Sequence, residues 1–303
     1  MNDRSNDRAE RRSFAQIPPG FETGEDAEKR CDKLLGQLEQ RPDLRGAKKL
    51  ALTLRSCGKP APCRSAACPR CNRAFRLRLY QQAQQILPRQ GEILAISLIP
   101  KSSRIEVGQL QDFDFSTWVE SRQRAISRAL PEDAIFIGGV DISLNTWENS
   151  DAHWCFHLYG FIILPDGWGI EKRRRRQHLR AAIAQHCPSL KPVEDGPNER
   201  PLLLKQCTLA DFRRGFLYAY KSQFYKRSRY MYQKRDSVTC SSNVHPQRLP
   251  ITSEIDLALF LARYGVGTRL MLVGVRRQGH DATFRLIRNA NRQSSGLGGE
   301  MAR

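Results

Sequence analysis

The sequence predicts an α+β protein with a mostly antiparallel sheet, helices on one face of that sheet and a small cysteine-rich module. Short apolar runs alternate with amphipathic stretches along residues 91–249, which favours a mixture of strands and helices. The polar turn between the runs at 134–145 and 153–164 is short, and such a turn joins antiparallel strands, because a parallel pair needs a long crossover. The module is expected because four of the nine cysteines fall between residues 57 and 71.

Each expected element rests on a local pattern. Apolar residues at helical spacing predict the helices, and short apolar runs that end at Pro or Gly predict the strands. The elements expected in chain order are helices at 26–40 and 70–87, a strand at 93–99, a helix at 115–130, strands at 134–145 and 153–164, a basic helix at 170–186, a strand at 202–205, a basic aromatic helix at 209–225, an irregular stretch at 226–249, a helix at 252–264, and a hairpin at 269–275 and 283–287.

These elements divide the chain into five expected segments. They are a disordered tail at 1–23, a helix with the cysteine module and a basic helix at 24–90, an α+β domain at 91–249, a helix and hairpin packed on that domain at 250–290, and a second disordered tail at 291–303. The tails are expected to be disordered because they are polar and lack periodicity.

The charge of the chain predicts a polyanionic partner. The net charge is +19, from 50 Lys and Arg against 31 Asp and Glu, and basic residues cluster at 172–176, 213–214 and 226–235. A surplus of this size creates a field that attracts nucleic acids, although a basic surface kept for solubility is the alternative. The residues expected to contact nucleic acid are Arg173, Arg174, Arg175, Arg176, Arg213, Arg214, Lys221, Lys226, Arg227 and Arg229.

Membranes are a less suitable partner. No apolar run approaches the roughly 18–20 residues that span a bilayer, and neither an amphipathic anchor nor a lipidation motif is present. Residues 1–12 contain no apolar signal-peptide core, so a cytoplasmic location is expected. The odd number of cysteines argues against a full disulfide framework and agrees with that location. Nothing in the sequence predicts an oligomeric state.

The clustered cysteines predict a structural zinc site. Cys57, Cys63, Cys68 and Cys71 supply four soft ligands, and the last two form the tight Cys-x-x-Cys turn that zinc sites commonly use. Four thiolates leave no open coordination position, so the ion is expected to be structural rather than catalytic. Unrelated buried thiols, or a redox-active Cys-x-x-Cys pair, are the alternatives.

A second polar cluster lies on the expected hairpin. Alternate residues of a strand share a face, so His153, Cys155, His157 and Tyr159 are expected to point one way, and Trp154, Phe156 and Leu158 the other. Asp141 on the neighbouring strand is in a position to join the histidines. Imidazoles with a carboxylate would suit Mg²⁺ or Mn²⁺, whereas histidines merely exposed on a sheet are the alternative.

Tyrosines follow downstream in the stretch FLYAYKSQFYK at 216–226. The phenolate of Tyr218 or Tyr220 would attack a phosphodiester if a metal ion polarised the phosphate. The same rings would otherwise stack on bases or pack in the core.

The order of these features resembles the HUH endonuclease superfamily, especially rolling-circle replication initiators and related transposases. The resemblance covers roughly residues 50–235 and rests on the pattern ILAISLIP, VDIS, HWCFHLYGFII and FLYAYK. It implies a ferredoxin-like antiparallel sheet and metal-dependent nicking of single-stranded DNA with a 5′-phosphotyrosine link. Asp141 matches the acidic position, and Tyr218 or Tyr220 matches the nucleophile. Only His157-Leu158-Tyr159 fits the paired-histidine register, with tyrosine in the place of the second histidine and His153 four residues earlier.

The sequence is therefore compatible with three functions. The first is a Rep-like DNA nickase, the second a non-catalytic DNA-binding regulator or replication accessory with the same fold, and the third an RNA-binding zinc protein. A metabolic enzyme is disfavoured because the sequence has no Gly-rich phosphate loop.

Overall fold

The computed structural model describes residues 18, 20–58, 60–87, 91–100, 103–147, 150–164, 172–187, 201–233, 240–278 and 283–286. Its elements are α2 (Gly24–Glu39), α3 (Ala47–Arg55), α4 (Pro69–Ile86), β1 (Glu92–Leu98), β2 (Arg104–Glu106), η2 (Leu110–Asp112), α5 (Phe115–Ala129), β3 (Ile135–Trp147), β4 (Ser150–Leu164), α6 (Lys172–His186), β5 (Leu202–Cys207), α7 (Leu209–Gly215), η4 (Tyr218–Tyr220), β6 (Tyr225–Gln233), β7 (Cys240–Arg248), α8 (Ile251–Ala262), β8 (Leu270–Val273), β9 (Val275–Gln278) and β10 (Thr283–Leu286). Of the expected tail at 1–23, residues 1–17 and 19 lie outside the described residues, as does the whole expected tail at 291–303.

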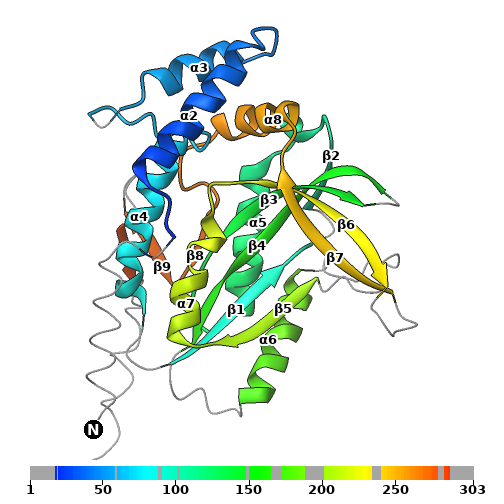
Figure 1. Cartoon of the computed structure of the whole chain (residues 1–303). Coiled ribbons are helices and arrows are strands. Elements are labelled where there is room, and N and C mark those ends of the chain that lie inside the picture. Colours follow the sequence, from blue (N-terminus) through cyan, green and yellow to red (C-terminus); the bar gives the residue numbers. More distant parts are fainter. Residues whose placement is uncertain are drawn as a thin grey trace, which may run out of the picture.

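The fold is α+β with a mixed, mostly antiparallel sheet, as the sequence predicts in outline (Figure 1). The main path of the sheet is β5-β1-β4-β3-β6-β7, with β2 added beside β4 and β8 beside β3. Every described pair is antiparallel except β3 with β6. The predicted hairpin of β3 and β4 is confirmed, and its register sets Asp141 opposite His157.

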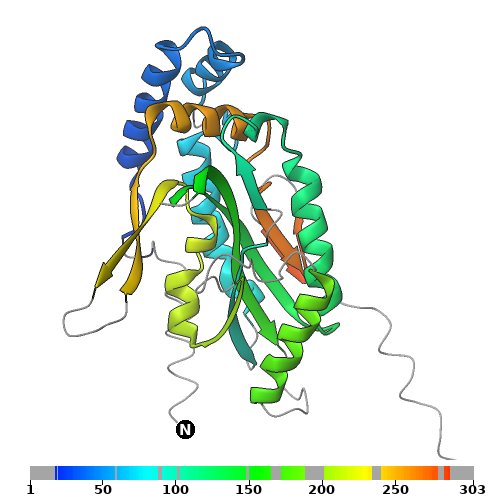
Figure 2. The ribbon, with the colours of Figure 1, turned by 90° about the vertical axis from the view of Figure 1, so that its right-hand side faces the viewer.

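Helices cover both faces of the sheet, so the expectation of helices on one face is wrong. Figure 2 shows α5 and α6 on one side of the sheet and α7 on the other. The reason is that the first part of β3 and the last part of β4 are apolar on both faces. Phe136 and Ile162 join one buried cluster, and Ile137 and Phe161 join another. Each of these clusters needs a covering layer.

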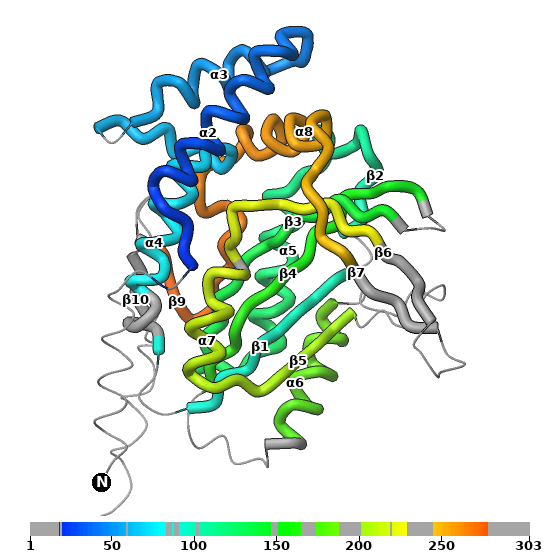
Figure 3. Tube along the Cα trace, viewed as in Figure 1, coloured from blue at the N-terminus to red at the C-terminus, as the bar shows by residue number. Residues whose placement is uncertain are grey.

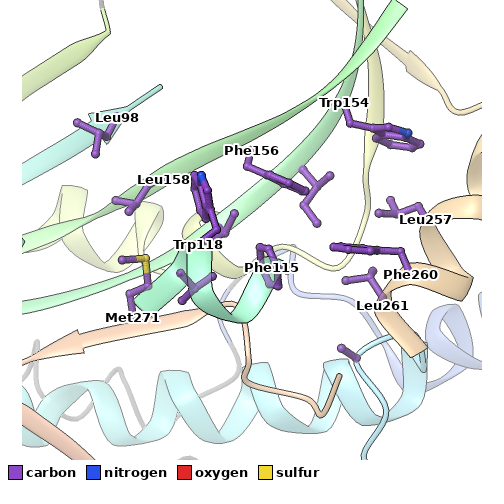
Figure 4. Close-up of a cluster of buried hydrophobic side chains, with 14 of the residues drawn as sticks. Leu98, Phe115, Trp118, Trp154, Phe156, Leu158, Leu257, Phe260, Leu261 and Met271 are labelled. Atoms are coloured by element: carbon purple, nitrogen blue, oxygen red, sulfur yellow. The ribbon is translucent and has the colours of Figure 1, made fainter. Parts of the chain in front are cut away.

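The larger core lies between β4, α5 and α8 (Figure 4). Trp154, Phe156 and Leu158 point into it, as the strand alternation predicts. The Phe156 ring lies 5.4 Å from Phe115 and 5.6 Å from Trp118, measured between ring centroids. This face of β4 is therefore closed to solvent, and a functional site on the strand must use the other face.

The strands β3 and β4 approach each other closely at two facing glycines. Gly138 pairs with Gly160, and a Cβ atom on Gly160 would lie 2.7 Å from the Cα of Gly138 and 2.8 Å from the carbonyl oxygen of Ile137. The Phe136 ring fills the space beside them. Glycine at these positions lets the two paired strands approach closely, three residues along each strand from Asp141 and His157.

An N-terminal helical layer packs on the end of the sheet (Figure 3). It consists of α2, α3, α4 and the C-terminal α8, and buried residues of the layer belong to the same apolar cluster as β4. Thr23 and Asp26 form a capping box that starts α2. The predicted segments 24–90 and 250–290 thus share one core, and α3 is a helix that the sequence reading missed.

Three expected elements differ from the structure. The helix expected at 209–225 is a short α7 followed by the 3-10 turn η4. The stretch expected to be irregular at 226–249 forms the β6–β7 hairpin. The strand at 270–273 pairs with β3 rather than with 283–286, because Gly274 has φ of 72° and turns the chain before β9. None of the described helices is long and apolar enough to cross a bilayer.

Candidate functional site

The four predicted cysteines meet in one cluster. Cys57 follows α3, Cys63 lies in the next loop, and Cys68 and Cys71 flank the start of α4. The Sγ atom of Cys57 lies 3.5 Å from that of Cys71 and 3.6 Å from that of Cys68, and the Sγ atoms of Cys63 and Cys71 are 3.7 Å apart. Sulfurs at ~2.3 Å from one tetrahedral ion would lie about 3.8 Å apart. The cluster therefore fits a metal ion.

Backbone hydrogen bonds support the cysteine cluster. The N–H of Cys63 donates to the Cys57 sulfur at 3.4 Å, and the N–H of Arg64 donates to the Cys71 sulfur at 3.3 Å. Arg64 has a left-handed φ of 56°, a backbone conformation that few non-glycine residues adopt. The buried Asn72 side chain donates to the carbonyl oxygens of Ala66 and Cys68 and fixes the turn between them. In the described part of the chain, no other group of three or more His, Cys, Asp or Glu side chains converges in this way.

A polar site lies on the sheet face that carries Asp141 and His157. Nε2 of His157 lies 2.7 Å from the hydroxyl of Ser97 on β1, a residue that the sequence reading missed. Burial lowers the pKa of His157 to about 4, with a smaller opposing effect of Asp141, so the imidazole is neutral near pH 7. Nδ1 of His157 and Oδ1 of Asp141 are buried and have no hydrogen-bond partner among the described residues.

Two cations balance the charge of Asp141. Its side chain has no exposed surface, and its Oδ2 accepts from Lys221 Nζ at 2.8 Å and from Arg227 Nη2 at 3.0 Å. Burial lowers the pKa of Lys221, and the nearby carboxylate of Asp141 opposes this effect. Lys221 follows η4 and Arg227 lies on β6, so the two segments that the sequence reading misassigned supply both partners.

The two candidate tyrosines differ sharply in environment. Tyr218 is 44% exposed, its ring centroid lies 5.1 Å from Lys221 Nζ, and its ring packs on that of Tyr159. Tyr220 is buried, its hydroxyl accepts from the N–H of Gly267 at 2.6 Å, and burial raises its pKa. Tyr218 is therefore next to the polar site and open to solvent, whereas Tyr220 is a core residue.

Arg269 holds the backbone around the polar site, and no local sequence pattern indicates this role. The side chain is buried, and its guanidinium lies between the rings of Tyr220 and Phe224, at 4.5 Å and 4.9 Å from their centroids. It donates to the carbonyl oxygens of Val140 at 3.0 Å and Lys221 at 2.8 Å. Val140 precedes Asp141 in the chain, and Lys221 is the ion-pair partner of Asp141. Arg269 therefore links β3 to the turn after η4.

His153 lies apart from this site. It is four residues from His157 along β4, which corresponds to about 13 Å, and its Nδ1 lies 3.0 Å from the carbonyl oxygen of Asp151. His157 Nδ1 and Asp141 Oδ1 therefore remain as the two ligand atoms for a divalent cation. Mg²⁺ often binds through one or two carboxylates with waters and substrate phosphates, so these two atoms fit at most such a partial set.

The predicted nucleic-acid-binding residues fall on two faces. The helix α6 packs on α5, on the sheet face opposite Asp141, whereas α7, η4 and β6 border the polar site. Several of the cations have acidic partners: Arg175 pairs with Glu92 and Arg214 with Asp211, in addition to the pairs of Lys221 and Arg227 with Asp141. Arg174 is exposed, and Arg176, Arg213 and Lys226 are partly buried. The side chains of Arg173 and Arg229 lie outside the described part.

Comparison of the chain with protein-family models, curated proteins and solved structures gives no significant match.

Proposed function

We propose that the chain is a Rep-like protein that binds single-stranded DNA and nicks it through Tyr218, with zinc in the cysteine cluster. The observation that carries the proposal is the contact of the exposed Tyr218 ring with Lys221, whose ammonium pairs with the buried Asp141 opposite His157. A solvent-accessible nucleophile, a cation and a neutral imidazole thus lie near one another on a polar sheet face. The net charge of +19 supports a nucleic-acid substrate.

The strand order supports the ferredoxin-like core that this proposal implies. The segments β1-α5-β3-β4-α6-β5 follow the β-α-β-β-α-β sequence of that arrangement. Their strands lie in the antiparallel order β5-β1-β4-β3, so the two α-helices of the unit cover one face and leave the Asp141 face for the site. This agreement concerns the central four strands, and β6, β7 and β8 extend the sheet beyond them.

In the proposed reaction, the Tyr218 oxygen forms a bond to phosphorus while the bond from phosphorus to the 3′ oxygen breaks. The phenol proton passes to water, and the 3′ oxygen takes a proton from water, so the products are a 5′-phosphotyrosine and a free 3′ hydroxyl. Lys221 is the cation closest to the Tyr218 ring and would neutralise charge on the phosphate. A divalent cation held by Asp141 Oδ1 and His157 Nδ1 would polarise the same phosphate.

The test is nicking of circular single-stranded DNA in the presence of Mn²⁺, with the protein–DNA adduct detected on a denaturing gel. Tyr218→Phe should abolish the adduct because it removes the nucleophilic oxygen. Tyr220→Phe should still form it but lose about 1–3 kcal/mol of stability, since the buried N–H of Gly267 loses its acceptor. Cleavage by the Tyr218→Phe protein, or by the double variant, would rule out this mechanism.

A non-catalytic DNA-binding protein is the second candidate. It is favoured by the state of Asp141, whose Oδ2 already pairs with two cations, and by the presence of a single imidazole near it. This candidate expects salt-sensitive binding of single-stranded DNA and no cleavage with any divalent metal. Tighter binding of single-stranded RNA than of DNA of matched sequence would instead favour an RNA-binding zinc protein.

A further inference from the structure

A groove of about 1140 Å³ lies between α3, the cysteine loop, η2 and α8, away from the Asp141 face. Figure 1 shows α3 and α8 at the end of the molecule that carries the N-terminal helical layer. Leu50, Leu259 and Tyr264 give the groove an apolar and aromatic lining. The Tyr264 ring is held by Phe115 and Phe260, at centroid distances of 5.5 Å and 5.4 Å, and it remains partly exposed.

The charge around this groove is positive. Five cationic side chains line it against two carboxylates, those of Asp112 and Asp256. Arg45, Lys49 and Arg64 are exposed and have no acidic partner among the residues that the structure describes. We refer to these three residues as the basic rim. The other two cations are engaged, since Arg41 pairs with Asp43, and Arg263 donates to the carbonyl oxygen of Gln111.

The cysteine cluster holds one wall of the groove. The carbonyl oxygen of Arg64 accepts from the N–H of Val266 at 2.6 Å, and that of Tyr264 accepts from the N–H of Ala66 at 2.9 Å. The same Arg64 donates its N–H to the Cys71 sulfur. The backbone of Arg64, a residue of the basic rim, is thus held next to the backbone that carries the Tyr264 ring by the cysteine loop.

We propose that this groove binds a single-stranded nucleic-acid segment, with phosphates on the basic rim and a base against Tyr264. Unpaired cations around an aromatic ring are the combination that binds a strand without reading its sequence. An acidic peptide would match the charge but would not require an aromatic ring in the lining of the groove. The inference rests on the proposed function only for the identity of the polymer, and the groove is a contact surface additional to the Tyr218 site.

The test compares two full-length zinc-loaded variants for binding of a fluorescent oligothymidylate. One is Arg45→Ala with Lys49→Ala and Arg64→Asn, where asparagine is chosen because it tolerates the positive φ of residue 64. The other is Lys48→Ala, a matched control, because Lys48 is exposed on the same helix but does not line the groove. Three lost phosphate contacts should weaken binding about 100-fold at about 0.1 M salt and reduce the salt slope by about 2.

Equal binding by the triple variant and the Lys48→Ala control would overturn the inference, as would displacement of the oligonucleotide by a polyglutamate peptide at lower concentration. Zinc content and thermal unfolding measured on both variants identify a folding defect, and a misfolded Arg64 variant is replaced by Arg45→Ala with Lys49→Ala alone. Nicking is assayed separately. Groove-dependent binding without any nicking would leave this inference intact and refute the cleavage proposal, and nicking with groove-independent binding would do the reverse.

Discussion

Asp141 is a carboxylate with no exposed side-chain surface, so its charge must be balanced inside the protein. Lys221 and Arg227 provide that balance, and Arg269 holds the backbone on either side of the pair. Lys221 follows η4 and Arg227 lies nearby on β6, whereas Arg269 comes from the distant segment just before β8. Removing one cation from such a buried pair costs more than a surface ion pair contributes, because the remaining charge is left uncompensated.

The neighbouring His157 gives a pH prediction. Its pKa is lowered to about 4, whereas an unfolded histidine titrates near 6.5. Between these values the unfolded state binds more protons than the folded state, so this residue makes the free energy of unfolding rise with pH. Its contribution should be full above about pH 6.5 and disappear as the pH falls toward 4, a change of roughly 2–3 kcal/mol. Urea unfolding of the zinc-loaded protein across this range measures it.

The control for this prediction is His157→Gln, which keeps a polar side chain opposite Asp141 but does not titrate. Its unfolding free energy should vary less steeply with pH than that of the wild type. An NMR titration that finds the His157 imidazole half protonated near pH 6.5 in the folded protein would contradict the prediction directly.

The close approach of β3 and β4 depends on the facing glycines Gly138 and Gly160. Gly160→Ala would place a methyl group 2.7 Å from the Cα of Gly138 and 2.8 Å from the Ile137 carbonyl oxygen, and neither backbone group can move without separating the strands. The expected loss is about 2–3 kcal/mol of stability, measured by thermal or urea unfolding. In Gly36→Ala, the added methyl group meets no atom within 4 Å on α2, so this control should be neutral or slightly stabilising. Equal stability of the two variants would mean that β3 and β4 do not approach each other this closely at Gly138 and Gly160.

The elements that the sequence predicted well have strong local patterns. The apolar runs of β1, β3 and β4 identified the central strands, and their alternation identified the buried face at Trp154 and Phe156. The β6–β7 hairpin was missed because its sequence, YKRSRYMYQ and CSSNVHPQR, is polar and lacks strand periodicity. The helix at 209–225 was overextended because Tyr220, Phe216 and Phe212 have helical spacing, while the chain turns at η4 so that Tyr220 reaches Gly267.

The candidate sites were predictable to different degrees, because some join residues that are close in the sequence and others join residues that are distant. Cys57, Cys63, Cys68 and Cys71 are close in sequence, so their spacing alone predicted the cluster. Asp141 and His157 followed from the hairpin register. The contacts of Ser97, Arg227 and Arg269 join residues that are distant in the chain, and no local pattern reports such contacts. Which tyrosine is exposed also depended on tertiary packing.

The cysteine cluster connects several parts of the molecule, so a metal ion bound there should stabilise more than the loop itself. It lies where α3, α4 and the turn after α8 meet, and Cys57, Cys68 and Cys71 belong to the main apolar core. We expect one zinc ion per chain, measured by elemental analysis. Removal with a chelator should lower the free energy of unfolding by several kcal/mol, a fraction of the roughly 10–16 kcal/mol with which zinc stabilises isolated finger peptides. Hydrogen exchange should then accelerate first in α3 and the start of α4.

A matched pair of cysteine variants separates metal binding from simple thiol packing. Cys57→Ser should lose zinc and stability, whereas Cys207→Ser, a partly exposed thiol outside the cluster, should keep both. A metal-free protein with the wild-type unfolding midpoint would contradict a structural zinc ion, and reversible oxidation of Cys68 and Cys71 to a disulfide would favour the redox alternative.

Two backbone contacts, Ala66 to Tyr264 and Val266 to Arg64, join the cysteine loop to the turn after α8, two segments that are far apart in the sequence. During synthesis, the cysteines leave the ribosome well before the segment around Tyr264 and Val266 that completes their wall. A nascent chain can therefore bind zinc before the surrounding layer has formed. The cysteine loop then gains its remaining backbone contacts only when α8 and the turn after it dock. Early stop codons upstream of residue 264 should then yield products that hold the ion but are readily degraded by proteases.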